Sequence, residues 1–563
     1  MKNIRIALAQ INTTVGDLNG NAEKIVSAIQ KARAMSSDVV VFPELSITGY
    51  PPEDLLLKKH FIDDNLATLK TVTPHTKNIT VVIGFVDRDS QKSLFNAAAV
   101  IANGKLKSVY RKNNLPNYGV FDEKRYFQKG EKVKIFSCDG ISLGISICED
   151  IWSDNGPCML QAKAGAQILL NLSASPYHLG KMKQREKVLS ACAKKLKATV
   201  CYCNLVGGQD ELIFDGGSFF VDPKGKTFAT GKQFEEDLIV ADIAVSPKAS
   251  KGKGVEKIRV EKNFKTKAGI FIKGRVHKHL KTEEEIYQAL VLGTRDYLYK
   301  NGFKKAVIGI SGGIDSALVA AIARDALGAK NVLGVSMPSP YTSSGTKKDA
   351  KRLAQNLGIE FMELSIKSIF AEYLKILKTI FGKTPSDVAE QNLQARIRGN
   401  ILMAISNKHG HLVLTTGNKS ETAVGYCTLY GDMAGGFAVI KDIPKTRVYK
   451  LVEFRNKKGK KAVIPQSIIK RAPTAELKKN QKDQDSLPAY DVLDAILAAY
   501  VEGDQAIGKF LKDKKARSLV KKTVDLVDHM EYKRRQAPLG IKISPKAFGK
   551  DRRLPITNKY REK

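Results

Sequence analysis

Three residues with the side chains needed for amide hydrolysis lie in the first half of the chain. Glu44 follows the apolar segment 39–42, Lys112 closes another extended segment, and Cys148 follows the apolar segment 141–147. Because a thiol is only partly ionised at neutral pH, a nucleophilic cysteine needs a carboxylate that takes its proton and an ammonium that favours the thiolate. Glu44 is the candidate base, and Lys112 with a backbone N–H near Cys148 is the candidate oxyanion partner. Together they predict an amidase site.

Each of these residues also has an ordinary structural explanation. A cysteine often fills a small buried space, a glutamate often ends a solvated strand, and a lysine is usually a surface charge. The occurrence of all three in matching contexts favours the catalytic interpretation. Cys201 and Cys203 share one predicted strand but lack the spacing of metal ligands, so we expect them in the core.

A glycine-containing turn in the second half of the chain has the features of an anion site. The apolar segment 306–310 leads into the Ser-Gly-Gly turn 311–313, and a helix opens with Asp315 and Ser316. Glycines allow backbone N–H groups to face an anion, and a helix N-terminus adds positive potential, so a pyrophosphate fits there. The turn is not a Walker loop, because no Gly-Lys-Ser/Thr follows. Asp315 is a candidate magnesium ligand; the alternative is a turn that only caps a packed helix.

The elements that must position the first group form an alternating α/β pattern over residues 4 to 244. The apolar segments predict strands at 4–11, 39–42, 79–85, 141–147, 167–172 and 199–205. Residues 246–280 are then rich in Lys and Gly, as in 246–248 and 251–254, which indicates a basic linker or surface arm.

A second core is predicted to begin near Thr282, where Glu285 has the spacing of a capping box. The strand 306–310, a helix that ends near Leu327 and the strand 332–337 follow the pattern of a parallel sheet in a nucleotide-binding domain. The predicted domains are therefore 1–245, which carries the candidate amidase residues, a linker of 246–280, and 281–563, which carries the glycine turn.

Length, charge and cysteine content limit the possible classes of function. A chain of 563 residues suggests two large domains, at roughly 150 residues or more per domain. No segment approaches the roughly 20 apolar residues of a membrane span. The start of the sequence lacks the pattern of a secretory signal. Seven cysteines without paired spacing favour reduced thiols in the cytoplasm. The net charge of +36 suggests nucleic-acid binding as one hypothesis. The lysines are diffuse and lack interleaved aromatics, however, which favours a solvated surface that attracts anionic substrates. We expect no membrane and no specific nucleic-acid partner.

The order and flanks of Glu44, Lys112 and Cys148 resemble the Glu-Lys-Cys triad of the nitrilase superfamily over roughly residues 1–245. This resemblance implies a four-layer αββα sandwich. The segments 115–123 and 173–177 resemble the glutaminase branch that is attached to NAD synthetases. The resemblance implies that glutamine is the amide and that three residues contact it: Tyr118, Ser175 and Lys181.

The glycine turn resembles the pyrophosphatase loop of enzymes that cleave ATP between its α and β phosphates. The segments 390–398, 415–421, 471–477 and 532–536 resemble the ligase domain of NAD synthetases, so the resemblance covers nearly the whole chain. It implies an adenine-nucleotide α-hydrolase-like domain with a parallel sheet. The implied ATP contacts are Gly309, Ile310, Ser311, Gly312, Gly313, Ile314, Asp315, Ser316 and Thr416. The implied deamido-NAD contacts are Asn392, Glu421 and Lys533.

Two arginines on the same predicted helix, Arg396 and Arg398, are either helix-face charges or phosphate ligands.

The resemblance implies that ATP, with magnesium, adenylates deamido-NAD and that ammonia from glutamine converts the adenylate to NAD. It also implies a homo-oligomer. An RNA-modifying ligase acting on tRNA and a scaffold protein with relict sites are the alternatives, and the glutaminase half and the Asn392 segment favour NAD synthesis over both.

Overall fold

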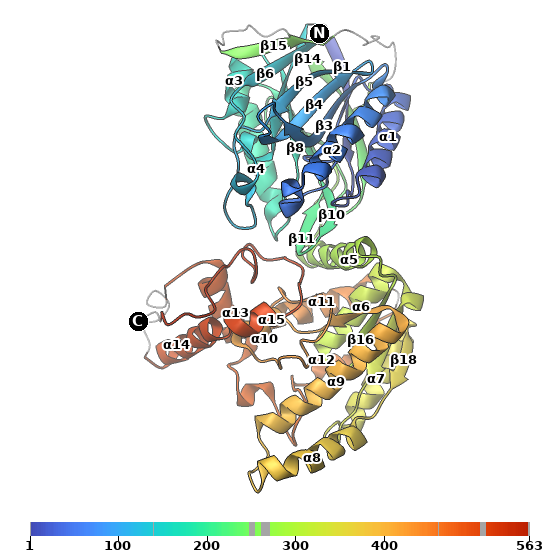
Figure 1. Cartoon of the computed structure of the whole chain (residues 1–563), viewed down its shortest axis with the longest axis vertical. Helices are drawn as coiled ribbons and strands as arrows, with labels where there is room; N and C mark the ends of the chain where they lie inside the picture. The colour runs from blue at the N-terminus through green and yellow to red at the C-terminus, as the bar shows by residue number, and fades with distance from the viewer. Residues whose placement is uncertain are drawn as a thin grey trace. The chain divides into compact units, whose positions relative to one another are not determined.

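The computed structural model describes residues 2–138, 140–246, 254–260, 271–459, 461–506 and 514–560. The chain divides into two compact units, one of residues 1–209 and 213–280 and the other of residues 210–212 and 281–563 (Figure 1). Much of the predicted basic linker, residues 247–253 and 261–270, lies outside the described residues. No helix in the described part of the chain is long and apolar enough to cross a membrane.

The first unit contains two large β-sheets. The first sheet has the order β14-β1-β2-β3-β4-β5 and the second has the order β13-β12-β9-β8-β7-β6-β15. The strands of the first sheet are β1 (Lys2–Gln10), β2 (Val39–Val41), β3 (Thr80–Arg88), β4 (Leu94–Ala102), β5 (Lys105–Arg111) and β14 (Asp237–Val245). Those of the second are β6 (Val133–Cys138), β7 (Ile141–Ile147), β8 (Ile168–Ser173), β9 (Thr199–Asn204), β12 (Phe219–Val221), β13 (Thr227–Thr230) and β15 (Val255–Arg259). A two-stranded sheet joins β10 (Val206–Gln209) and β11 (Leu212–Asp215).

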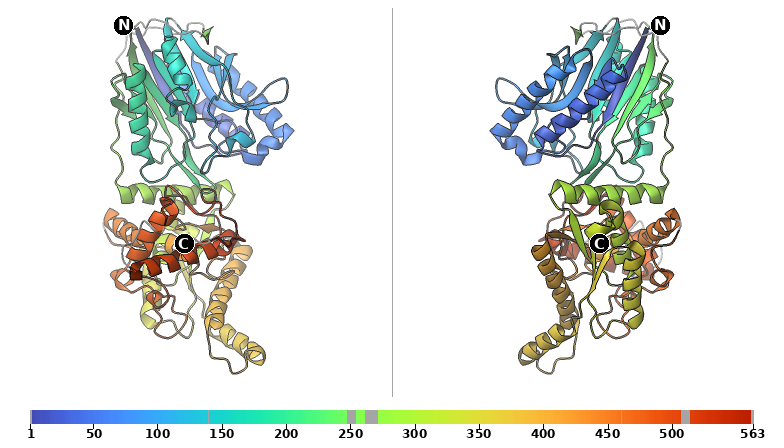
Figure 2. Two further views of the ribbon diagram at one scale, coloured as in Figure 1. Left: turned by 90° about the vertical axis from the view of Figure 1, so that its left-hand side faces the viewer. Right: turned by 90° about the vertical axis from the view of Figure 1, so that its right-hand side faces the viewer.

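Three apolar clusters show that this unit has four layers. One cluster joins residues of both sheets, such as Val82 and Leu170. A second packs Ile25 and Leu69 of the helices against the first sheet, and a third packs Leu189 against the second sheet. The helices are α1 (Leu18–Ala34) and α2 (Lys59–Val72) on one outer face, and α3 (Pro157–Lys163) and α4 (Lys181–Leu196) on the other (Figure 2). The predicted αββα sandwich is confirmed.

The buried strand β3 determines where the chain after β2 can run. The N–H of Phe42 donates to the carbonyl oxygen of Val82 at 2.9 Å, and the N–H of Ile47 donates to that of Gly84 at 3.2 Å. A Cβ atom on Gly84 would lie 2.4 Å from the backbone nitrogen of Leu45. Only glycine therefore allows the turn that carries Glu44 to lie against this strand.

Described parts of the segment 246–280 are hydrogen-bonded to the first unit. Strand β15 runs parallel to β6 at the end of the second sheet. Farther along, the N–H of Thr230 donates to the carbonyl oxygen of Arg275 at 2.8 Å, and the N–H of Asp242 donates to that of Ile272 at 3.0 Å.

The second unit is built on a five-stranded sheet of order β18-β17-β16-β19-β20, in which every pair of neighbours is parallel. The predicted parallel sheet is confirmed. Its strands are β16 (Lys305–Gly309), β17 (Val332–Ser336), β18 (Glu360–Glu363), β19 (His411–Thr415) and β20 (Phe437–Ala438). The main helices are α5 (Thr282–Lys300), α6 (Ile314–Leu327), α7 (Ser344–Leu357), α8 (Lys367–Phe381) and α9 (Val388–His409). Those that follow are α10 (Lys419–Val424), α11 (Lys445–Lys458), α12 (Gln466–Lys470), α13 (Tyr490–Leu497), α14 (Lys514–His529) and α15 (Glu531–Gln536).

Local details differ from the sequence-based expectations, and two of these differences have a clear physical cause. Helix α5 begins at Thr282 as expected, but its N-cap residue is Lys281, so the predicted capping box of Thr282 is wrong. Three glutamates, 283–285, instead lie in the first turn, where negative charge favours the helix dipole. Strand β4 was not predicted, because its alanine-rich sequence has little β propensity; pairing with β3 and β5 on both sides overrides that preference.

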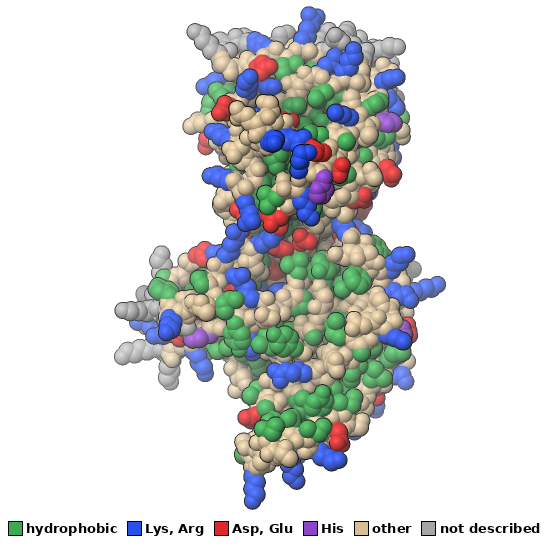
Figure 3. All heavy atoms as spheres, in the orientation of Figure 1, with side chains coloured by type: hydrophobic (Ala, Val, Ile, Leu, Met, Phe, Trp, Pro, Cys, Tyr) green, Lys and Arg blue, Asp and Glu red, His purple; other side chains and the backbone are tan. Residues whose placement is uncertain are grey.

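The basic side chains on one face of the molecule are scattered among other side chains. On the face shown in Figure 3, Lys and Arg side chains are distributed over both units, singly and in small groups, with Asp and Glu side chains among them. This distribution agrees with the expectation of a diffuse basic surface.

Candidate functional site

Glu44, Lys112 and Cys148 each lie directly beyond a strand of the first unit. Glu44 follows β2, Lys112 follows β5, and Cys148 follows β7 as the first residue of a short 3₁₀ helix, Cys148–Ile151. Their exposed fractions are 1%, 0% and 3%. The structure therefore removes three groups with acid–base or nucleophilic chemistry from bulk water and brings them to one end of the sandwich.

The Lys112 ammonium lies between two carboxylates. Its Nζ atom is 2.7 Å from Oε1 of Glu44, 2.8 Å from Oε1 of Glu123 and 2.9 Å from Oε2 of Glu123. The side-chain amide of Asn96 donates to Glu44 at 2.7 Å and to Glu123 at 3.4 Å. Glu123 was not singled out in the sequence, although it ends the segment 115–123; nothing in its local pattern marks it as a partner of Lys112.

Burial and charge set the protonation states in this group. Burial raises the pKa of Glu123 to about 7, against the opposing effect of Lys112. Burial alone would lower the pKa of Lys112, but Glu123 and Glu44 outweigh it and hold that pKa well above its usual range. Burial also raises the pKa of the Cys148 thiol well above its ordinary value. The thiol is thus protonated at rest, and a nucleophilic role requires a base such as Glu44.

The backbone at Cys148 is strained. Its φ angle is +42°, in the left-handed region that residues with a Cβ atom rarely occupy. Such a conformation persists only where surrounding contacts enforce it, and it is common for residues that present a side chain at a tight turn into a helix.

The three residues predicted to contact glutamine differ in burial. The hydroxyl of the exposed Tyr118 donates to Oε2 of Glu149, the neighbour of Cys148, at 3.0 Å. Ser175 is buried, and its neighbour Ala174 donates its N–H to Oε2 of Glu44 at 3.0 Å. Both are therefore tied to residues of the triad region.

Lys181 is the first residue of α4, and its Nζ atom lies 4.4 Å from the centre of the Trp152 ring. Burial lowers the pKa of Lys181 to about 8, with the nearby Arg185 adding to the shift. Arg185 is fully buried, and its Nε atom donates to Oγ of Ser175 at 3.2 Å. The charge of Arg185 thus acts on both Lys181 and Ser175, and sequence inspection did not identify it.

In the second unit the Ser-Gly-Gly turn links β16 to α6. Gly312 has a φ angle of +81°, and a Cβ atom there would lie 2.5 Å from the carbonyl oxygen of Thr346. The Ser311 hydroxyl accepts the N–H of Gly313 at 3.2 Å, and the Ser316 hydroxyl donates to the carbonyl oxygen of Gly313 at 3.0 Å. The two serines hold the turn at the start of the helix.

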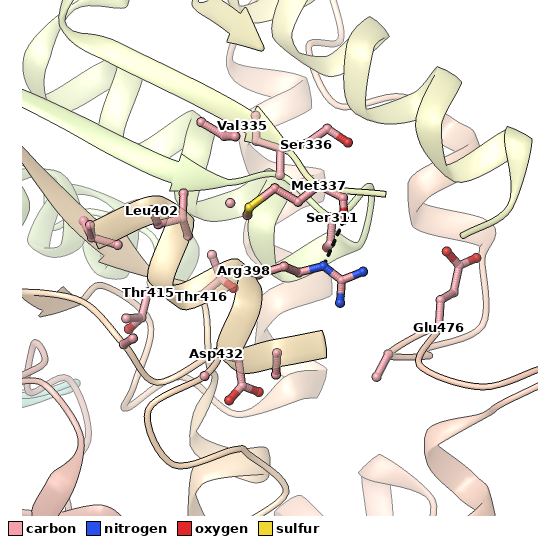
Figure 4. Close-up of a pocket in the computed structure, with 18 of the residues that line it drawn as sticks. Ser311, Val335, Ser336, Met337, Arg398, Leu402, Thr415, Thr416, Asp432 and Glu476 are labelled. Atoms are coloured by element: carbon pink, nitrogen blue, oxygen red, sulfur yellow. Dashed lines mark hydrogen bonds between the residues drawn. The ribbon is translucent and has the colours of Figure 1, made fainter. Parts of the chain in front are cut away.

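Two cavities open on this turn. The first, of about 250 Å³, has Thr416, Arg398 and Met337 in its wall (Figure 4). The predicted ATP residues that line the first cavity are Gly309, Ile310, Ser311 and Thr416. Those that line the second, of about 170 Å³, are Ser311, Gly312, Gly313, Ile314 and Asp315. Both cavities share Ser311, Asp432, Ala475 and Glu476, so they are neighbours on this turn, which Ser316 supports through its hydrogen bond to Gly313.

A second buried lysine lies beside Asp315. Lys445 contacts Oδ2 of Asp315 and lies 3.3 Å from Oε1 of Glu421, while Asn418 donates to Oδ1 of Asp315 at 3.0 Å. Burial raises the pKa of Glu421 to about 8, opposed by Lys445. Asp315 and Glu421 both line the smaller cavity. Lys445 also lines it and was missed in the sequence, where it is one lysine among many.

Two of the three predicted deamido-NAD residues contact one loop, and the third lies on α10, the helix that leads into that loop. Glu421 lies beside Asp315, whereas Asn392 and Lys533 converge on the loop 425–428. Oδ1 of Asn392 accepts the Thr428 hydroxyl at 2.7 Å, and Nζ of Lys533 donates to the carbonyl oxygens of Gly425 and Cys427 at 2.8 and 2.9 Å. Neither Asn392 nor Lys533 lines the two cavities.

The two helix arginines are separated by the structure. Arg398 lies in the wall of the larger cavity, where its Nε atom donates to the carbonyl oxygen of Met337 at 2.9 Å (Figure 4). Burial lowers the pKa of Arg398 to about 10. Arg396 is exposed and donates to the carbonyl oxygen of Leu429 at 3.2 Å.

Comparison with known proteins assigns a family to each half of the chain. The carbon-nitrogen hydrolase family model matches residues 5–247, and the NAD synthase family model matches residues 286–537. Glutamine-dependent NAD(+) synthetases of Thermotoga maritima and Aquifex aeolicus are 48% and 46% identical, covering 100% and 99% of this chain and 100% of each relative. The structure of the glutamine-dependent NAD+ synthetase from Acinetobacter baumannii in complex with ADP is 41% identical, with a TM-score of 0.76 and full coverage of both chains.

Replacing Lys112 with Met is expected to lower the free energy of unfolding of the first unit by about 3–5 kcal/mol, because two buried carboxylates lose their cation. The loss should be smaller below pH 6, where Glu123, whose pKa is raised to about 7, is protonated and leaves less charge unpaired. Urea denaturation followed by the fluorescence of Trp152, the chain's 1 tryptophan, measures this. Lys59→Met is the control, because Lys59 is 79% exposed and its surface pair with Asp63 is screened by solvent and contributes little. Equal losses in the two variants would contradict a central role for Lys112.

Proposed function

The chain belongs to the family of glutamine-dependent NAD(+) synthetases, and from that we propose how its residues divide the reaction. The first unit hydrolyses glutamine to glutamate and ammonia. The second uses ATP to activate deamido-NAD and joins the ammonia to it. The observation that best supports glutamine hydrolysis by the first unit is the buried Lys112 ammonium, which lies 2.7 Å from Glu44 in the region of Cys148.

In the amidase half, Glu44 takes the proton of the Cys148 thiol, and the sulfur attacks the side-chain carbonyl carbon of glutamine. The proton then passes to the leaving nitrogen as ammonia departs, and water hydrolyses the thioester to glutamate. Lys112 and a backbone N–H near Cys148 stabilise the oxyanion, and each such donor contributes on the order of 3 kcal/mol. The raised pKa of Cys148 supports this order of events, because the thiolate forms only as Glu44 accepts the proton.

Glutamine is held by Tyr118, Ser175 and Lys181. The Lys181 ammonium suits the substrate carboxylate, and its partial burial strengthens that attraction. Arg185 supports this role for Ser175 through the contact between its guanidinium and the serine hydroxyl.

In the ligase half, residues 309–316 and Thr416 bind ATP in the two neighbouring cavities. The nicotinate carboxylate of deamido-NAD attacks the α-phosphorus, pyrophosphate leaves, and ammonia then displaces AMP to give the amide of NAD. Backbone N–H groups of the turn and the Lys445 ammonium offset charge on the departing pyrophosphate. Asn392, Glu421 and Lys533 bind deamido-NAD, with Asn392 and Lys533 shaping the loop 425–428.

Magnesium fits the donor set near the turn. Asp315 and Glu421 present hard carboxylate oxygens in the wall of one cavity. The described residues hold no cluster of three or more His, Cys, Asp or Glu side chains suited to a metal, so further ligands would come from phosphate and water, as is usual for this ion. When bound by Asp315, magnesium neutralises phosphate charge.

Two broader properties are also proposed. The described cysteines are all free thiols, which supports a reducing compartment, the cytoplasm.

On helix α8, Ile376 and Ile380 have exposed fractions of 63% and 78%, which supports burial of this helix in a homo-oligomer.

Replacing Cys148 with Ala should abolish NAD formation from glutamine while leaving NAD formation from ammonium salts at raised pH. The thiol is needed only to release ammonia, and removal of a covalent nucleophile costs on the order of 10⁶ in rate in a serine protease. Product assays with the two nitrogen sources make the comparison. Cys201→Ala, which shortens a fully buried core cysteine, should keep both activities. Glutamine-dependent activity in the Cys148 variant would make Cys148 a packing residue.

Replacing Asp315 with Asn should abolish NAD synthesis from either nitrogen source, because it removes charge from the phosphate side of the ligase site, while glutamine hydrolysis stays measurable. Asp325→Asn is the matched control on the same helix. Asp325 pairs with Arg455 at 2.6 Å and is not among the residues that line the two cavities, so its loss should affect stability alone. Undiminished NAD formation by the Asp315 variant would reject its assigned role.

A further inference from the structure

A buried aspartate next to the amidase triad has no part in the chemistry described above. Asp150 lies two residues after Cys148 and is 0% exposed. Its carboxylate accepts four hydrogen bonds, and all four donors belong to the two segments that carry Cys148 and Lys112 or to the strand that precedes Lys112.

One oxygen of Asp150 holds the cysteine turn. Oδ2 accepts the N–H of Ile147, the residue before Cys148, at 3.0 Å, and the hydroxyl of Tyr110 in β5 at 2.8 Å. Because Cys148 has a φ angle of +42°, its turn needs contacts that enforce it. The hydrogen bond to Ile147 fixes the peptide between Ser146 and Ile147, one residue before the strained Cys148.

The other oxygen holds the lysine segment. Oδ1 accepts the N–H of Asn113 at 3.1 Å and the N–H of Asn114 at 2.8 Å, the two residues directly after Lys112. One carboxylate thus joins two segments that are 36 residues apart between Asn114 and Asp150. The positions of the nucleophile and of the oxyanion partner depend on the same group.

The four donors require an ionised carboxylate. Each is an N–H or O–H group that must meet a lone pair, and an ionised carboxylate offers only lone pairs. Burial raises the pKa of Asp150 to about 6, so the group still carries its charge at neutral pH. An asparagine side chain has the same shape, but its NH₂ group would face two donors and leave them unpaired.

We propose that Asp150 is a positioning residue that sets the distance between Cys148 and Lys112 by tying both of their turns to one carboxylate. The inference rests on the proposed glutaminase activity. It assigns to Asp150 neither proton transfer nor substrate contact. Since an error of about 1 Å in the placement of reacting groups costs about 10²-fold in rate, loss of this tie should appear in kcat.

The test measures glutamine hydrolysis by Asp150→Asn in the full chain. We expect kcat to fall by about 10²-fold, with little change in the KM for glutamine, because Tyr118, Ser175 and Lys181 keep their places. NAD formation from ammonium should remain as in the wild type. A wild-type protein that does not hydrolyse glutamine would refute the proposed function, whereas an active wild type with an equally active Asp150 variant would refute this inference alone.

Asp242→Asn is the control that distinguishes a positioning role of Asp150 from a general loss of stability. Asp242 is also buried in the first unit and accepts hydrogen bonds from Arg5 and the N–H of Ile272 at 2.7 Å each. Its variant should lose comparable stability in urea yet keep kcat. If both variants lose the same fraction of kcat at the same loss of stability, or if Asp150→Asn changes only KM, Asp150 has no positioning role.

Tyr110→Phe keeps the test decisive if Asp150→Asn does not fold. It removes one of the four hydrogen bonds and leaves the three backbone donors in place. We expect a fall in kcat of several-fold, about the effect of one net hydrogen bond of 1 kcal/mol, with KM unchanged. An unchanged kcat in this variant would then overturn the proposal.

Discussion

The amidase half of this protein depends on one buried cation held between two carboxylates. Taking Lys112 out of water is costly, and only the close approach of Glu44 and Glu123 offsets that cost. The same contacts restrict where β2 and β5 can end and hold Glu44 at the triad. The sandwich core, the close contact at Gly84 and the ties made by Asp150 all bring these strand ends together in the orientation that the cation requires.

The ligase half repeats this arrangement with different residues. Lys445 lies between Asp315 and Glu421, as Lys112 lies between Glu44 and Glu123. In each group burial raises the pKa of one glutamate, Glu421 to about 8 and Glu123 to about 7. Both sites therefore hold a lysine charge firmly while keeping a carboxyl group close to the point where it gains or loses a proton at neutral pH. Perturbed groups of this kind are frequent at sites of chemistry.

Sequence inspection predicted the parts of the fold whose local pattern is strong. The segment 141–147 coincides with β7, and the helix that ends at Leu327 was expected to end there, because apolar runs and glycine turns are local signals. Strand β4 escaped prediction because its alanines have little β propensity, and its extended form depends on pairing with the adjacent strands β3 and β5. Similarly, Cys148 and the turn 311–313 were singled out by residue type, whereas Glu123 and Asp150 act as partners of other groups, and no spacing in the sequence marks a partner. Lys445 was missed because it is one lysine among many.

The central claim is that nitrogen released from glutamine in one unit becomes the amide nitrogen of NAD in the other. Its most direct test supplies the purified chain with ATP, deamido-NAD and glutamine labelled with ¹⁵N at the side-chain amide, without added ammonium, and measures the mass of the product. We expect NAD that carries one ¹⁵N in its carboxamide, with none formed when glutamine or ATP is omitted. Unlabelled NAD, or labelled ammonia that accumulates without any NAD, would contradict it.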